Sequence, residues 1–173
     1  MKRSTSNFTL NVSNTPPQFG YRNITGTTNI TDVSIFAGSA ASNFGSGTAL
    51  VIGVFNSGDS RALFNFTLPT LSNASISSAI LRLYNLSTFG GANVNGGTIN
   101  VSAYMVNSSW LEGTCSAGAG CANNLTWNGS TWNERYNGTN WGTAGGDYYT
   151  HINDSEINFT PNNIVGTVNV TLT

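Results

Sequence analysis

Charge is what this sequence has least of. Only 8% of its 173 residues are Asp, Glu, Lys or Arg, against roughly 25% in an average globular protein. The net charge is -1 and no basic patch is present, so nucleic acid and anionic membranes are not expected partners. Aromatic residues reach 11%, which a disordered chain would not carry. A folded surface so poor in charge needs another means of staying solvated.

Histidine is almost absent as well. His151 is the only one, so neither a histidine-based catalytic triad nor a metal centre is expected. Acidic residues are few, and no spacing among them indicates the paired carboxylates of a glycosidase. One enzymatic hypothesis combines His151 with Tyr148 and Arg135 in polysaccharide-lyase chemistry. We predict instead that the chain is not an enzyme.

Long apolar runs are missing, and cysteines are scarce. No stretch of about twenty apolar residues exists, so no membrane span is expected. The chain starts with basic residues but has no apolar segment behind them, so we expect a removed signal peptide or a fragment. Cys115 and Cys121 enclose a loop of Ser, Gly and Ala. They predict a local disulfide of a secreted protein, and no second cysteine pair or histidine nearby favours a metal.

Apolar and polar residues alternate along several stretches of the sequence. From Arg61 onwards, Phe64, Phe66 and Leu68 alternate with Asn65, the two-residue period of a half-buried strand. After a turn-forming stretch, a second stretch of the sequence alternates in the same way. The sequence therefore predicts two core strands joined by a loop, in an all-β fold without useful helix signals or repeats.

Further strands are expected at several places in the chain. They are predicted at residues 7–13, 32–36, 49–55, 98–106, 156–160 and 164–172. The run 49–55 is almost continuously apolar, which is typical of a central strand buried on both faces. We divide the chain into an N-terminal strand with a proline-rich spacer, residues 1–19, and a β-sandwich domain, residues 20–173.

The N-terminal strand has two different faces. Phe8, Leu10 and Val12 lie on one side, and Asn7 and Asn11 on the other. Two consecutive prolines follow and cannot continue a hydrogen-bonded ladder, so the strand is expected to be held apart by a stiff spacer. It is either an ordinary first strand of the sandwich or a donor strand, anchored by Phe8, Leu10 and Val12, that completes a neighbour's sheet.

The core stretch also carries a family resemblance. The residues concerned are 61–71 and 76–84, together with Asp32–Ile35, Asn43–Gly45, Trp110–Gly113 and Thr126-Trp127. In order and spacing they resemble the DNRLRE domain, a group that includes the disaggregatase-related repeats of archaea and some carbohydrate-binding modules. The resemblance covers roughly residues 30 to 135 and implies a secreted, jelly-roll-like β-sandwich without catalytic residues.

The resemblance has two further implications. Family members usually continue through further strands, so we expect an incomplete sandwich that a donated strand completes. Asp32 lies where jelly rolls often hold a structural calcium, but one carboxylate is too few ligands to define a site. No other cofactor is expected.

Asn-X-Ser/Thr acceptor signals, or sequons, are unusually dense. They begin at Asn7, Asn11, Asn23, Asn29, Asn65, Asn73, Asn85, Asn100, Asn107, Asn124, Asn128, Asn137, Asn153, Asn158 and Asn169. Roughly six would arise by chance from the content of Asn, Ser and Thr. This excess predicts covalent N-glycans that solvate the surface, and the alternative is compositional drift in a β-rich protein. The sequons indicate an archaeal or eukaryotic surface, and the resemblance favours an archaeal one.

Residues 107–149 contain all four tryptophans. Trp127, Trp132, Trp141 and Tyr148 are candidates for a sugar-binding platform, with Asp147 to accept hydroxyl groups. Alternatively, these aromatic side chains plug one end of the sandwich. Sequons nearby disfavour an open ligand face.

Together these observations predict an extracellular, cell-surface glycoprotein. The favoured hypothesis is a structural filament subunit that binds identical subunits by donor-strand complementation. The alternative is a non-catalytic module of a larger secreted protein that binds an external polysaccharide.

Overall fold

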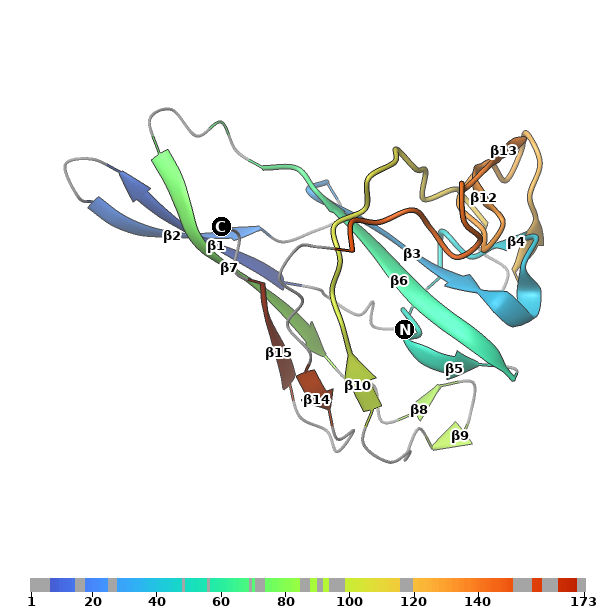
Figure 1. Cartoon of the computed structure of the whole chain (residues 1–173), viewed down its shortest axis with the longest axis horizontal. Helices are drawn as coiled ribbons and strands as arrows, with labels where there is room; N and C mark the ends of the chain where they lie inside the picture. The colour runs from blue at the N-terminus through green and yellow to red at the C-terminus, as the bar shows by residue number, and fades with distance from the viewer. Residues whose placement is uncertain are drawn as a thin grey trace. The chain divides into compact units, whose positions relative to one another are not determined.

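The computed structural model shows an all-β chain, as predicted (Figure 1). It describes residues 7–14, 18–24, 28–47, 49–55, 57–68, 70, 74–84, 88–89, 92–93, 99–115, 120–150, 157–159 and 165–170. Within these ranges the one helix is a single 3-10 turn, η1 (Ala37–Ser39). Strand pairs with a defined register are antiparallel.

The chain forms two compact units. One consists mainly of Thr31–Asn65 and Tyr104–Ile152, and the other mainly of Ser4–Ile30, Phe66–Ala103 and Asn153–Thr173. Both units draw on segments far apart in the sequence. The predicted boundary at residue 19 falls inside a strand.

The first unit is built on a three-stranded sheet with the order β3-β6-β5. Its strands are β3 (Ile30–Phe36), β6 (Gly58–Phe66) and β5 (Gly53–Phe55). Two short pairs complete it: β4 (Ser42–Asn43) with β11 (Cys121–Ala122), and β12 (Glu134–Tyr136) with β13 (Thr139–Asn140).

A small apolar core fills this first unit. Val33 and Ile35, two residues apart on β3, pack with Leu63 of β6 and with Trp141 from the long C-terminal segment. Val106, Trp110 and Trp132 pack against this cluster. The residues 104–150 therefore supply a large share of the apolar side chains that cover the sheet.

The apolar run 49–55 is not the central strand that the sequence predicts. Only Gly53–Phe55 forms a strand, at the edge of its sheet, and Val54 is 75% exposed. Gly53 has a positive φ of 114°, and the N–H of Val51 donates to the Ser34 hydroxyl. β3 is the more deeply buried strand here, with Val33 through Phe36 all buried.

The second unit contains a four-stranded sheet with the order β15-β7-β1-β2. Its strands are β15 (Val165–Val170), β7 (Ala74–Tyr84), β1 (Asn7–Asn14) and β2 (Gln18–Ile24). Two short pairs accompany it: β8 (Thr88–Phe89) with β9 (Ala92–Asn93), and β10 (Ile99–Val101) with β14 (Ile157–Phe159). β10 ends well before Val106, which instead forms an isolated bridge to Tyr148.

The N-terminal strand is an interior strand of this sheet. β1 pairs with β2 along one edge, where Phe8 is opposite Ile24. It pairs with β7 along the other, where Leu10 is opposite Ala79 and the register shifts between Asn11 and Val12. In a single chain β1 is therefore not held apart from the body of the fold, because both of its edges are occupied.

Candidate functional site

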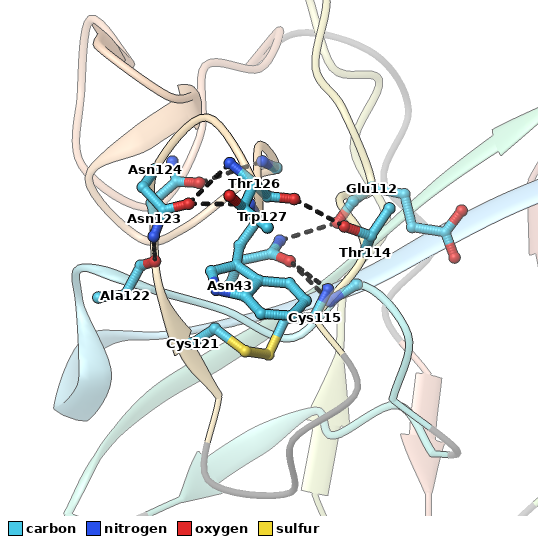
Figure 2. The surroundings of a disulfide bond; sticks show 12 residues. Asn43, Glu112, Thr114, Cys115, Cys121, Ala122, Asn123, Asn124, Thr126 and Trp127 are labelled. Atoms are coloured by element: carbon cyan, nitrogen blue, oxygen red, sulfur yellow. Dashed lines mark hydrogen bonds between the residues drawn. A yellow bond between two sulfur atoms is a disulfide. The ribbon is translucent and has the colours of Figure 1, made fainter.

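The predicted disulfide is formed. Cys115 and Cys121 are bonded, with their Cα atoms 5.7 Å apart, and Cys115 is fully buried. Cys121 begins β11, whose partner β4 contains Asn43 (Figure 2). The disulfide therefore closes a short loop within the segment 104–152, and the β4–β11 pairing joins that loop to the short strand that follows η1.

Asn43 is the polar centre of this region and is fully buried. Its Nδ2 donates to the carbonyl oxygens of Glu112 at 2.8 Å and Ser130 at 3.0 Å. Its Oδ1 accepts from the N–H groups of Gly45 at 3.2 Å and Cys115 at 3.4 Å (Figure 2). One amide thus satisfies backbone groups from three segments that no strand ladder joins.

The sequon asparagines whose side chains the structure describes are all accessible. Asn29, Asn65, Asn107 and Asn124 are exposed, and Asn128 and Asn137 are half-buried. Asn43 has no Ser or Thr two positions later, and it alone among the described asparagine side chains is fully buried. No sequon asparagine with a described side chain is therefore buried, although Asn123, Asn133 and Asn140, which begin no sequon, are also exposed or half-buried.

Of the other sequons, some lie on described strands and some lie outside the described residues. Asn7 and Asn11 lie on β1, Asn23 on β2, Asn100 on β10, Asn158 on β14 and Asn169 on β15. Asn73, Asn85 and Asn153 lie outside the described residues. β2 and β15 are the two outer strands of the four-stranded order, so each outer strand carries a sequon.

The four predicted sugar-binding aromatics do not form one platform. Trp141 is 5% exposed within the core of the first unit, and its Nε1 donates to the Thr131 carbonyl at 3.0 Å. The side chain therefore exposes little surface, and a sugar-binding role for Trp141 stays a prediction. Trp127 lies elsewhere, at the end of a turn where its N–H donates to Asn124 Oδ1 (Figure 2).

Trp132 and Tyr148 do come together, but around a cation. The Arg61 guanidinium lies 5.0 Å from the Trp132 ring centroid and 5.6 Å from that of Tyr148. Arg61 Nη1 also donates to the Gly145 carbonyl at 2.8 Å. Tyr148 further contacts Tyr104, with ring centroids 4.8 Å apart. The two rings thus hold an arginine, which is a structural use of aromatic faces.

The side chain of Asp147 accepts hydrogen bonds from the loop that follows Trp141. The hydrogen bond from the Gly142 N–H lowers the pKa of its carboxyl group, and burial opposes this effect. Hydrogen bonds from the Thr143 N–H and the Ser108 hydroxyl, and the charge of Arg135, lower the pKa further. With three protein donors on its oxygens, Asp147 serves the loop rather than a ligand.

A polar cleft of about 410 Å³ lies in the first unit and was not predicted. Its polar lining consists of Asn123, Asn133, Glu134 and Asn140, and Trp141 also borders it. We refer to it as the asparagine cleft. The one signal in the sequence was negative: none of its three asparagines begins a sequon.

The described residues show no assembled catalytic site that would support the enzymatic hypothesis. His151 lies outside the described residues, and the Arg135 guanidinium lies over the Tyr136 ring, 5.1 Å from its centroid. No group of three His, Cys, Asp or Glu side chains suited to a metal occurs in the described ranges, and calcium at Asp32 stays a prediction. Across those ranges no helix is long and apolar enough to cross a membrane.

Comparisons with protein-family models, curated proteins and solved structures give no match. The resemblance to the DNRLRE domain therefore stays a prediction, and function has to be argued from the residues themselves.

Proposed function

We propose that this protein is a heavily N-glycosylated structural protein of an extracellular surface. The observation that carries the proposal is the density of acceptor signals, together with the accessibility of those whose side chains the structure describes. Fifteen of 25 asparagines begin sequons, and the six whose side chains the structure describes are exposed or half-buried: Asn29, Asn65, Asn107, Asn124, Asn128 and Asn137. N-glycans are bulky and need surface positions, and this distribution meets that need.

A glycan coat also supplies what the composition lacks. With 8% charged residues, the surface has few groups that resist association. Outer strands are the most exposed to unwanted pairing, and β2 and β15 carry Asn23 and Asn169. Sugars at these positions would shield both edges of the four-stranded sheet. The jelly-roll-like arrangement and the DNRLRE relationship belong to the same proposal, because both imply a secreted, non-catalytic domain.

Assembly by strand exchange is the second part of the proposal. β1 occupies a slot between β2 and β7, and the β1 of an identical copy would fit that slot with the same register. Exchange of an identical element between copies preserves its contacts and costs little beyond rearranging the hinge. The sequence between β1 and β2 contains two consecutive prolines, which favour extended backbone over a tight hairpin turn. Copies linked in this way form a polymer.

Mass spectrometry of peptides from native material tests the glycan coat. We expect sugar on most of the fifteen sequons, including the exposed Asn29, Asn65, Asn107 and Asn124. Unmodified asparagine at all four of these positions would disprove the proposal, because accessibility is then not what the sequons serve.

Engineered cysteines test the exchange directly. Leu10 and Ala79 lie opposite each other in the β1–β7 register, so L10C/A79C should cross-link different chains if β1 is exchanged. Electrophoresis of assembled material without reductant should then show a ladder of covalent oligomers. The control L81C/V168C joins β7 to β15, a pair that remains within one chain, and should give monomers. Monomers from both variants would exclude exchange.

A further inference from the structure

The asparagine cleft contains hydrogen-bonding groups that the fold leaves unused. Among the described residues, the side-chain amides of Asn133 and Asn140 have no protein partner, and both residues are exposed. Each amide offers two N–H donors and one carbonyl acceptor. A ligand rich in hydroxyl groups, which also donate and accept, is the complement of such a surface.

Two other polar side chains of the cleft, Asn123 and Glu134, are held in place. Asn123 Nδ2 donates to Glu134 Oε2 at 2.7 Å, and Asn123 Oδ1 accepts from the Gly129 N–H at 3.1 Å. The Asn123 N–H itself donates to the Ala41 carbonyl at 3.0 Å. These bonds fix the amide from both ends and leave the second oxygen of Glu134 free to accept from a ligand. A pre-positioned acceptor lowers the entropy cost of binding.

The backbone places the four polar side chains on one small framework. Asn133 is tied to the segment after η1 by its N–H, which donates to the Ala40 carbonyl at 3.1 Å. Glu134 and Asn140 are directly opposite in the β12–β13 hairpin. Residues opposite each other in an antiparallel pair share a face, so carboxylate and amide are presented together.

The size and charge of the cleft narrow the ligand further. A volume of about 410 Å³ is at the small end of the range of ligand pockets, roughly 300–1,000 Å³. Ala41, Ala122 and Ala144 line it with short side chains and leave room between the amides. Glu134 is the one charged side chain in the lining, so a negatively charged ligand would be repelled.

From this geometry we propose that the asparagine cleft binds one unit of a neutral saccharide. Asn133, Asn140 and Glu134 hydrogen-bond its hydroxyl groups, and Asn123 positions Glu134. None of the asparagines in the lining begins a sequon, so no glycan is attached to a lining side chain. The inference goes beyond the proposed structural role and does not depend on it, because binding is expected for a monomer as well as for a polymer.

Titration of the full chain with free sugars tests the proposal. The probes are glucose, galactose, mannose and N-acetylglucosamine, with glucuronate as the acidic comparison, followed by isothermal calorimetry or ligand-observed NMR. We expect millimolar binding of at least one neutral sugar and none of glucuronate. N133A/N140A should weaken that binding at least tenfold while leaving the melting temperature unchanged, because both side chains are exposed.

Three further variants make the result specific. Trp127→Ala should leave binding unchanged, since Trp127 does not line the cleft. Ala144→Trp should abolish it by filling the space. Glu134→Gln keeps an acceptor for Asn123 and removes the charge, so it should admit glucuronate as well. Absence of binding by every neutral probe, or binding that responds to W127A and not to the cleft variants, would overturn the proposal.

Discussion

The side chain of Asn43 joins three segments that no strand ladder connects, and it adds to the backbone hydrogen bonds from Ser46 to Cys115 and from Ser130 to Leu111. It is small enough to be enclosed by close backbone, and a Cβ at Gly113 or Gly129 would collide with its amide. The neighbouring glycines and the buried asparagine therefore require one another. This explains why a chain that places so many asparagines on its surface buries this one.

Asn43→Ala should lower the free energy of unfolding by about 3 kcal/mol, because four hydrogen bonds are lost and buried backbone groups stay unpaired. Denaturant unfolding monitored by tryptophan fluorescence measures the change. The exposed Asn133→Ala is the matched control and should stay within about 0.5 kcal/mol of the parent. Equal effects from both variants would contradict the role assigned to Asn43.

Asp147 gives the fold a dependence on acidic pH. Its pKa is lowered from 3.8 in the folded chain, so the folded state favours the carboxylate. This stabilisation is fully present above the unfolded value of 3.8 and is lost as pH falls through the lower folded value. Asp147→Asn should therefore melt at lower temperature than the parent at pH 6, and the gap should narrow towards pH 2.5. A gap independent of pH would contradict this assignment.

At the scale of single elements, two sequons face each other. Asn100 of β10 and Asn158 of β14 are directly opposite in the strand register, and opposed residues lie only about 5 Å apart. Two N-glycans cannot leave the same face at that spacing without crowding. The pair should therefore compete for occupancy.

Peptide mass spectrometry checks this competition. Peptides that carry sugar on both Asn100 and Asn158 in one molecule should be rarer than independent occupancy predicts. Asn100→Gln should raise occupancy at Asn158 and leave Asn65, on β6, unaffected. Full occupancy of both sites in the parent protein would show that the pair does not compete.

Local pattern predicted several elements well. The alternation of Phe64 and Phe66 with Asn65 places a strand where β6 lies, and Asn65 is exposed as expected. β1 likewise covers nearly the predicted residues. In such stretches the period of two is itself the physical cause of the structure, so the sequence suffices.

The other features depend on packing between residues far apart in the sequence, which local pattern does not reveal. Trp127 and Trp141 are equivalent in local sequence terms, but only Trp141 meets Val33 and Ile35 from a strand about a hundred residues away. The run 49–55 is apolar enough for a central strand, yet the positive φ of Gly53 and the position at a sheet edge leave it partly exposed. The asparagine cleft likewise exists only after β12 and β13 pair beside the segment from residue 40.

At the scale of the whole molecule, solubility should depend on sugar. A net charge of -1 gives little repulsion between copies, and the proposed glycans would add a hydrated polar cover. Replacing the exposed Asn29, Asn65 and Asn107 with Gln removes three sequons while keeping an amide at each position. Light scattering should then show stronger self-association than in the parent.

N133Q/N140Q is the matched control for this experiment. It makes the same substitution at exposed asparagines that begin no sequon, so scattering should match the parent. Equal self-association in both variants would show that the amides themselves, and not the sugars, keep the protein dispersed.

The sheet order β15-β7-β1-β2 also dictates the sequence of events during biosynthesis. β1 leaves the ribosome early and β2 follows at once, but the other partner of β1, β7, follows only after β3, β5 and β6 have been translated, and β15 comes last. Pairings so distant along the chain form slowly, and a nascent apolar strand is prone to aggregate while it waits. Oligosaccharides attached early to Asn7 and Asn11 would keep β1 soluble until β7 is available, so these sugars would act during folding as well as in the folded protein.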